Sequence, residues 1–451
     1  MPKTTGSSTT TKQQSKTKRT TKSTSKRTSK ATPESTEKTV SRKPESQLRS
    51  QLRVTCDQST LNDYLDFISK AVPHNPTHAI LSNVLLVADE TKQILKLSTY
   101  NLEFGMQASF ESTVSKSGQM TLPSALLQQM VRKFPHGQLT IECLISENDD
   151  GAEPALNALL FAADTERFEI MGMVADEFPE LPRVNNKLIT LPASLLISQL
   201  KGSLFAASSN DTKRILNSSH FMLNQDAERG LDTFKTWTTD GHRMALMAGA
   251  EMSKQQPLVE SARFTIPVKV LRELERNLNP TDQVTLYYEG DNNSGTVIFE
   301  WNEKRLVTRT IEGQYPDCTA LIEPWKEQYC REFITERLAL LLALERLAVL
   351  SDKSVKTVSV KLDGTKQKIH LTIEHKEVGN GKVSLDAQIN GDDLTIKFDV
   401  RYFIDVVKAI SSSNIRVSIA SVCIPTLITP YGTTAQGEAP IDAEYILAPL
   451  H

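Results

Sequence analysis

The stretches TLPSALLQQMVRKFPHGQLTI at residues 121–141, TIPVKVLRELERNLNPTDQVTL at 265–286 and KFDVRYFIDVVKAISSSNIRVSI at 397–419 repeat one pattern. In each, a short strand leads into apolar residues at helical spacing, and a polar turn is followed by an alternating strand. Pro123 and Pro267 fit the first turn of such a helix, where the missing N–H costs no hydrogen bond. The pattern predicts the same strand–helix–strand unit three times.

A second pattern comes before each of these units. It occupies residues 59–86, 192–223 and 335–362, and each copy indicates an amphipathic helix of about three turns, a loop and a strand. From one unit to the next the pattern moves by 144 residues and then by 132, which is the size of a domain. A solenoid repeat is much shorter, so this class of fold is excluded.

Two helices and several alternating strands in each repeat predict an α+β domain, in which both helices pack on antiparallel sheet. Segments such as LTIECL, VTLYYE and GTVIFEW show the alternation of half-buried strands. The sequence therefore predicts three similar domains in a row. We expect them at residues 52–183, 187–324 and 330–451.

The N-terminal segment has a different composition. Residues 1–50 contain 13 Lys or Arg, 3 Asp or Glu, 13 Thr and 10 Ser, and no aromatic residue. Because the whole chain has 52 basic and 54 acidic residues, the remainder has 39 and 51, a net charge of −12. Such a segment buries too little apolar surface to offset its ordering entropy, so we expect a disordered basic tail over residues 1–51. Three interpretations stay open: salt-dependent contact with phosphates, a solvated leader, or a plastid transit peptide, which the many lysines disfavour.

Several classes of protein are excluded by what the sequence lacks. No run approaches eighteen apolar residues and no apolar stretch opens the chain, so we expect neither a membrane span nor a secretory signal. The five cysteines are odd in number and never form CxxC, which disfavours a disulfide framework or a cysteine zinc site. We expect no metal and no cofactor, and a reducing, cytoplasmic compartment.

The segment TTDGHRMAL at residues 238–246 is the most specific signal in the chain. With the threefold repeat, it resembles the bacterial DNA polymerase III β subunit family, the sliding clamps, whose members have T-D-G-H-R-L-A here. The resemblance covers residues 52–451. Shorter matches in the same order are Ile80-Leu81, Asn83, Leu216-Asn217, Gly313, Tyr315-Pro316-Asp317 and the C-terminal Tyr445-Ile446-Leu447-Ala448-Pro449-Leu450-His451.

The resemblance implies a head-to-tail homodimer that closes into a ring around duplex DNA. Such a clamp tethers the replicative polymerase as a processivity factor and has no catalytic activity of its own. A heterologous interface that closes generates a ring, and edge strands that pair across it leave no exposed edge. By position, the family's interface falls on Phe168 and Ile170 in the first domain and on Val349 and Leu350 in the third. The alternative is that these four belong to intradomain cores.

The resemblance also implies that the helices line the ring and meet DNA phosphates without reading sequence. The expected basic residues on them are Lys70, Arg132, Lys133, Lys201, Lys269, Arg272, Arg276, Arg346 and Lys408. Asn210, Lys213 and Arg214 lie where family members touch DNA at the ring face. Family members often have aromatic residues in place of Arg214 and Ile215 and a basic one in place of Asn75. For any single lysine, a solvated helix face is the alternative.

A peptide-binding groove between the second and third domains is the last implication. The residues carried over to it are Leu216, Thr239, Gly241, His242, Arg243, Met244, Pro316, Ala320, Leu321, Cys423, Pro425, Ile446 and Ala448. The implied partners are the polymerase III catalytic subunit, the clamp loader, and other replication or repair proteins with short apolar motifs. Ala320 stands where Arg is common in the family, and Ala448 where Met is common. The alternative is an ordinary core at a domain boundary.

His242 also invites an enzymatic interpretation, because Asp240 precedes it by two residues. No G-x-S-x-G elbow, H-E-x-x-H motif or P-loop accompanies it, and Asp240-Gly241 is typical of a tight turn. The competing hypothesis is thus an α+β enzyme of nucleotide or DNA metabolism that uses His242 and a carboxylate.

Overall fold

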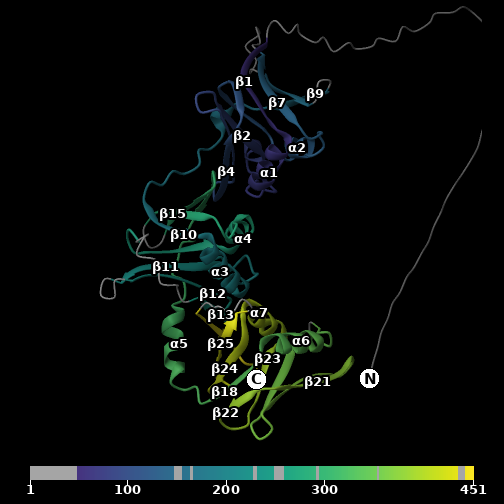
Figure 1. Ribbon diagram of the computed structural model, residues 1–451, viewed down its shortest axis with the longest axis vertical. Helices are drawn as coiled ribbons and strands as arrows, with labels where there is room; N and C mark the ends of the chain where they lie inside the picture. The colour runs from purple at the N-terminus through teal and green to yellow at the C-terminus, as the bar shows by residue number, and fades with distance from the viewer. Residues whose placement is uncertain are drawn as a thin grey trace, which may run out of the picture. The chain divides into compact units, whose positions relative to one another are not determined.

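The computed structural model describes residues 48–146, 155–162, 166–226, 231–247, 258–290, 294–352, 355–434 and 442–450. Within these ranges every strand pair is antiparallel, and the strands form four sheets accompanied by seven α-helices (Figure 1). The predicted α+β class is confirmed. Strand β1 (Leu48–Asp57) begins four residues before the predicted start of the first domain. The rest of the predicted tail, residues 1–47, lies outside the described residues.

Six of the helices form the three contacting pairs that the repeats predicted. They are α1 (Gln58–Ser69) with α2 (Ser124–Val131), α3 (Ala193–Ser203) with α4 (Val268–Asn277), and α6 (Arg337–Ala348) with α7 (Val400–Ala409). A further helix, α5 (Cys318–Lys326), was not predicted. The predicted end of the second domain at residue 324 falls inside α5.

The helices begin where the sequence supplies a cap or a proline. Asp57 caps α1 by accepting a hydrogen bond from the Thr60 amide at 3.0 Å, which satisfies one of the free N–H groups of the first turn. Pro123 and Pro267 lie one position earlier than predicted, as the last residues of strands β6 (Gly118–Pro123) and β14 (Ala262–Pro267). Each strand therefore runs directly into its helix, and the proline still leaves no amide without a partner.

The four sheets differ in size. The five-stranded sheet has the order β5 (Thr113–Lys116), β1, β7 (Gln138–Ser146), β8 (Ala155–Ala162), β9 (Glu166–Gly172). The eight-stranded sheet has the order β10 (Lys187–Pro192), β15 (Gln283–Gly290), β16 (Gly295–Trp301), β17 (Lys304–Arg309), β4 (Phe104–Glu111), β3 (Ile94–Tyr100), β2 (Asn83–Asp89), β6. The nine-stranded sheet has the order β14, β11 (Ser218–Asp226), β12 (Leu231–Thr239), β13 (Arg243–Met247), β26 (Ala443–Leu447), β25 (Thr426–Thr434), β24 (Ser412–Ile419), β18 (Arg331–Glu336), β22 (Gln388–Asn390). The four-stranded sheet has the order β21 (Gly379–Asp386), β20 (Lys368–His375), β19 (Thr357–Asp363), β23 (Thr395–Asp399).

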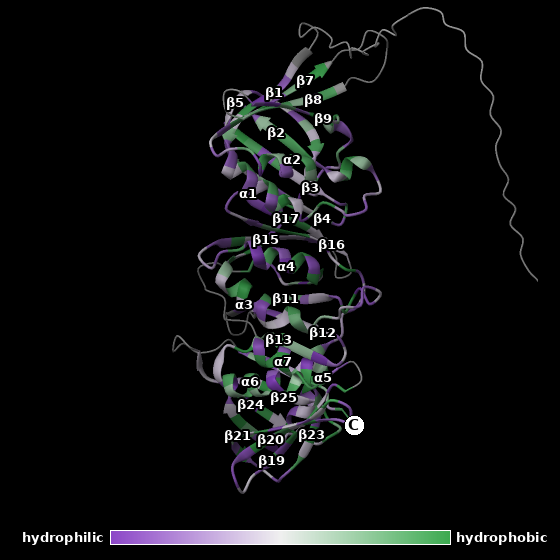
Figure 2. Cartoon of the chain, turned by 90° about the vertical axis from the view of Figure 1, so that its right-hand side faces the viewer, coloured by the Kyte–Doolittle hydropathy of each residue, from purple (hydrophilic) through white to green (hydrophobic). Residues whose placement is uncertain are grey.

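Two strand pairs join what the sequence divides into separate domains. Strand β4 pairs with β17, where Met106 lies opposite Leu306 (Figure 2). Strand β13 pairs with β26, where Met244 lies opposite Ile446. Because each sheet is shared between neighbouring domains, backbone hydrogen bonds as well as side chains hold the repeats together.

The hydrophobic core, like the sheets, is shared between neighbouring domains. One cluster of buried side chains extends from the first repeat into the second, where the rings of Phe67 and Trp301 meet edge to face at 5.8 Å. Full burial of a side chain such as Leu65 stabilises the fold by about 1.5–3 kcal/mol. Among the described residues, no helix is long and apolar enough to cross a membrane.

Candidate functional site

The segment that carries the family signal is a tight turn between β12 and β13. Asp240 Oδ1 accepts hydrogen bonds from the amides of His242 at 2.8 Å and Arg243 at 3.0 Å. Gly241 has a φ of +92°, a backbone conformation that side-chain-bearing residues rarely adopt. The predicted turn is confirmed, and it leaves His242 exposed while Thr239 and Arg243 are buried.

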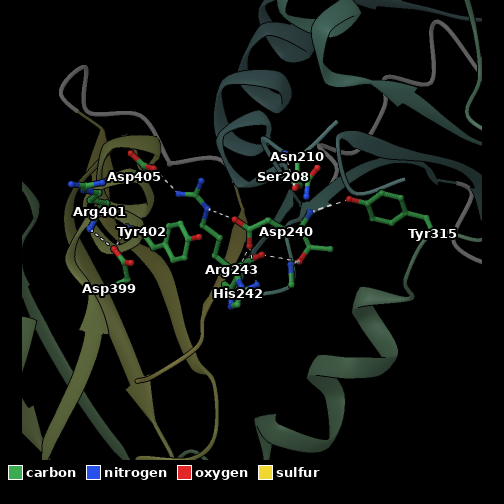
Figure 3. Close-up of polar contacts among 12 residues, drawn as sticks. Ser208, Asn210, Asp240, His242, Arg243, Tyr315, Asp399, Arg401, Tyr402 and Asp405 are labelled. Carbon is green, nitrogen blue, oxygen red and sulfur yellow. Dashed lines mark hydrogen bonds and ion pairs between the residues drawn. The ribbon is translucent and has the colours of Figure 1, made fainter. Parts of the chain in front are cut away.

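Arg243 joins this turn to helix α7 (Figure 3). Its Nε lies 3.1 Å from Asp240 Oδ2, and its Nη1 lies 2.6 Å from Asp405 Oδ2. The guanidinium carbon also lies 4.5 Å from the centre of the Tyr402 ring and 5.3 Å from that of Phe205, within the range of cation–π attraction. Since Arg243 is only 9% exposed, these contacts replace the water that its charge has lost.

The other side of the turn rests on Tyr315 and on the C-terminal segment. The Thr239 amide donates to the Tyr315 hydroxyl at 3.0 Å, and that hydroxyl donates to the Ser218 carbonyl at 3.2 Å. Burial raises the pKa of Tyr315, so it stays a neutral donor. The Ala448 amide donates to the His242 carbonyl at 2.9 Å, which attaches the C-terminal segment to the turn.

An apolar cluster lies under the predicted groove. Its buried members are Trp237, Met244, Leu246, Tyr315, Cys318, Ile322 and Ile446, and its half-buried neighbours are Ile215, Met222, Trp325 and Leu427. Of the predicted groove residues, Met244 and Ile446 are 7% and 4% exposed, so both belong to the buried part of this cluster. Leu321 on α5 is 47% exposed and offers an apolar side chain to a ligand.

The remaining predicted groove residues lie at the surface to different degrees. The half-buried ones are Leu216, Pro316, Pro425 and Ala448, and the exposed ones are Gly241, His242, Ala320 and Cys423. Ile215, which was not among the predicted groove residues, packs against the apolar cluster. Its neighbour Leu216, which was predicted, is not among the described residues of that cluster. The backbone brings Pro425 close to Ile446, because the residue after Pro425, Thr426, pairs with Leu447, which follows Ile446.

Several residues of this region were missed by sequence reasoning. Trp237 and Leu246 share a strand face with Thr239 and Met244, so the period of two could have identified them. Tyr402 and Asp405 lie on one face of α7 at helical spacing, but nothing in the sequence connects them with a turn 162 positions away.

The basic residues predicted to face DNA are exposed on or beside the paired helices. Some have carboxylate neighbours: Lys70 and Arg132 lie 3.3 and 3.8 Å from Asp66, Arg276 lies 2.7 Å from Glu273, and Lys408 lies 2.8 Å from Glu345. Exposed pairs of this kind contribute little and exchange readily for phosphate. Among the described residues, no ion pair is formed by Lys133, Lys201, Lys269, Arg272 or Lys213.

A cavity of about 600 Å³ lies on the helix side of the turn. Lys269, Arg272 and Arg276 of α4 line it together with Arg243 and Asp405. The cationic helix surface and the turn are therefore neighbours.

The loop predicted to touch DNA, residues 210–214, is held by polar contacts. Asn210 Oδ1 accepts from the Thr212 amide at 3.0 Å, and Arg214 lies 3.2 Å from Glu103 of the first repeat. Arg214 and Glu103 are both exposed, so this pair too can exchange for phosphate, and Arg214 stays a candidate for DNA beside the exposed Lys213.

The four predicted interface residues do not share one environment. Phe168 is 42% exposed and Val349 is 81% exposed, which leaves both available to a partner. Ile170 is 2% exposed in the core of the first repeat, and Leu350 is half-buried against that of the third. For Ile170, the alternative of an intradomain core residue fits the structure. Phe168 lies on β9, an edge strand of its sheet.

Comparison with known proteins agrees with this architecture. Models of the DNA polymerase III beta subunit match in order: the N-terminal domain at residues 52–182, the central domain at 190–317 and the C-terminal domain at 327–437. The beta sliding clamp of Synechococcus elongatus is 34% identical over 403 residues, which are 88% of this chain and 99% of that protein.

Solved structures show the same fold. The DNA polymerase sliding clamp from Bacillus subtilis has a TM-score of 0.76 at 23% identity and covers 89% of this chain and 100% of its own. A sliding clamp from Pseudomonas aeruginosa, solved bound to griselimycin, has a TM-score of 0.74 at 20% identity, with the same coverage.

The repeats and the TDGHR turn thus define a three-domain clamp of bacterial type. The chain belongs to the DNA polymerase III beta subunit family, the beta sliding clamps. The role of processivity factor in DNA replication follows from the family, as does the absence of catalysis. The enzymatic interpretation of His242 is therefore wrong.

Proposed function

We propose that this chain closes with a second copy into a ring around duplex DNA, with its three helix pairs toward the DNA. One observation carries the proposal: Lys133, Lys201, Lys269 and Arg272 are exposed cations on or beside these helices, in a body that is acidic overall. Contacts between such cations and phosphates hold DNA at any sequence, which suits a tether that slides. The domains that form each half-ring are 52–183, 187–324 and 330–451.

The groove beside the TDGHR turn binds short peptides of the clamp's partners. The buried side chains of Met244 and Ile446, the exposed Leu321 and the polar turn match a pocket that is mostly apolar with a few orienting polar groups. A P. aeruginosa clamp bound to griselimycin supports ligand binding by this family. The partners are the polymerase III catalytic subunit, the clamp loader and other replication or repair proteins, in the cytoplasm.

Retention on DNA circles tests the ring directly. The full chain is loaded onto a nicked plasmid with its own clamp loader and ATP, and the complex is separated by gel filtration at high salt. We expect the protein to stay with the circle and to be lost after one restriction cut, because a topological link needs no affinity. Equal loss from circular and linear DNA would contradict the ring.

Leu321→Ala tests the groove. Truncation of a large apolar contact at a binding hot spot costs about 2 kcal/mol, which is roughly thirtyfold in affinity. We expect this loss for a fluorescent peptide from the C-terminal region of the polymerase catalytic subunit, measured by anisotropy. Because Leu321 is already 47% exposed, the substitution leaves the fold intact, whereas truncation of the buried Met244 also opens a cavity.

The matched control is Leu338→Ala on α6. Leu338 is 49% exposed, so the two substitutions remove the same side chain at nearly equal exposure. Peptide affinity should be unchanged in this control. If both variants bind the peptide as tightly as the wild type, Leu321 does not line the groove.

A further inference from the structure

A row of polar side chains crosses the junction between the first and second domains on one face of the eight-stranded sheet. In this sheet Lys96 lies opposite Ser109, Gln107 lies opposite Arg305, and Arg305 lies opposite Glu300. Opposite residues of antiparallel strands share a face, so this row spans the neighbouring strands β3, β4, β17 and β16.

This face points away from the paired helices. On β3 the helix side is taken by Leu95, Leu97 and Thr99, and the Thr99 hydroxyl donates to the Ile68 carbonyl of α1 at 2.6 Å. Successive residues of a strand alternate between faces, so Lys96 and Ser98 lie on the other one. The row is therefore separate from the helix surface proposed to meet DNA.

Three cations, Arg305, Arg183 and Lys96, lie in this region, and the carboxylate of Glu300 pairs with Arg305. Arg305 lies on β17, with its Nε 3.2 Å from Glu300 Oε1, and it donates from Nη2 to the Pro182 carbonyl at 3.2 Å. The latter contact holds the segment between the two domains on the sheet and brings Arg183 to the same place. Among the described residues, neither Lys96 nor Arg183 has an ion-pair partner.

The three cations act on one another. The pKa of Lys96 is lowered first by burial and then by the charges of Arg183 and Arg305. The pKa of Arg305 is also lowered, mainly by burial and in part by Arg183, while Glu300 opposes the change. Lys96 and Arg305 are half-buried like charges, so their repulsion costs free energy, which an anion would recover.

Neutral donors accompany the charges. A cavity of about 380 Å³ beside the row is lined by Gln107, Ser109, Thr285, Glu300, Glu303, Lys304 and Arg305, among others. Lys96 and Arg183 lie outside this lining. The Gln107 amide donates to the Ser98 hydroxyl at 2.9 Å, which fixes its orientation beside Lys96. The flat guanidinium groups match the geometry of a two-oxygen acceptor.

We propose that Lys96, Arg183 and Arg305 form an oxyanion site on this face of the clamp. Its ligand is either a carboxylate of an acidic peptide segment or free inorganic phosphate, and both supply the same acceptor oxygens. The proposal does not depend on the ring or on the groove.

Thermal unfolding and calorimetry of the full-length protein test this site. The variants are Arg183→Gln, which alters an exposed side chain, and the double variant Lys96→Gln/Arg183→Gln; Lys361→Gln, an exposed strand lysine elsewhere, is the control. Sodium phosphate is compared with sodium chloride at equal ionic strength, and a penta-glutamate peptide with penta-glutamine.

Phosphate at about ten times its Kd should raise the melting temperature of the wild type and the control by about 2 °C, and that of the double variant by much less. In chloride, the double variant should melt at or above the wild-type temperature, because repulsion is removed.

The two sources of the oxyanion give different results. Calorimetric binding of penta-glutamate, lost in the double variant, identifies an acidic peptide. A phosphate response that is lost in the double variant, without penta-glutamate binding, identifies the free ion. Equal responses of wild type and double variant to both probes overturn the site, as does a double variant that melts several degrees lower in chloride, since its cations would then be satisfied within the chain.

Discussion

Arg243→Ala is expected to lower the free energy of unfolding of the clamp body by about 3–5 kcal/mol. The side chains of Arg243 and Asp240 are each 9% exposed, so removal of the cation leaves a buried carboxylate without its counter-charge. The contact with Asp405 on α7 and the stacking on Tyr402 are lost together. Because these contacts join the second repeat to the third, the loss should appear as earlier unfolding of both.

Arg276→Ala is the matched control for this prediction. Arg276 also pairs with a carboxylate three positions away, at 2.7 Å from Glu273, but its side chain is 65% exposed. An exposed pair contributes at most about 1 kcal/mol, so the urea midpoint should hardly move. Similar urea midpoints for the two variants would show that burial of the Arg243 contacts does not increase the free energy of unfolding.

Asp405→Asn separates charge from packing at the same place. The amide keeps the size of the carboxylate but removes the charge that faces Arg243 at 2.6 Å. We expect an intermediate loss of stability and weaker peptide binding, because the turn is held from α7. If Asp405→Asn matches the wild type in both measurements, the contact does not position the turn.

The repeated helices were predictable because periodicity is a local property. The stretches after Pro123 and Pro267 have apolar residues at helical spacing, and each forms a helix that starts one position later than expected. Helix α5 was missed because Pro324 lies inside it, and a proline normally indicates the end of a helix. Its Asp317 cap, which accepts from the amides of Thr319 and Ala320, was the signal that could have revealed it.

The candidate site was predictable only in part, because it depends on contacts between repeats. The family signal located the turn, yet Arg243 finds its second partner in Asp405, which no local pattern connects with it. The predicted interface residues show in the same way that burial depends on contacts that the sequence pattern does not contain. Phe168 and Ile170 share a strand face by the period of two, but only Ile170 is covered by the core, whereas Phe168 lies farther along β9 beside Phe134 at 5.1 Å.

Val349→Asp is expected to convert the dimer into monomers. Val349 is 81% exposed in the single chain, so a carboxylate there is fully solvated and leaves the fold intact. In the closed ring, the same carboxylate is buried without a partner, which costs several kcal/mol and weakens association by about a hundredfold or more. Leu350 serves this test less well, since its side chain already packs in the third domain.

Val259→Asp is the matched control for Val349→Asp. Val259 is 60% exposed in the second domain, so the substitution adds the same charge at another exposed valine. Sedimentation equilibrium should give twice the chain mass of 50.2 kDa for the wild type and this control, and the single mass for Val349→Asp.

Phe168→Asp, on the opposite side of the predicted interface, should also give the monomer mass, because a head-to-tail ring places Phe168 of one copy against Val349 of the other. If Phe168→Asp stays dimeric while Val349→Asp dissociates, β9 is not the partner surface, and if both stay dimeric, the ring closes through other residues.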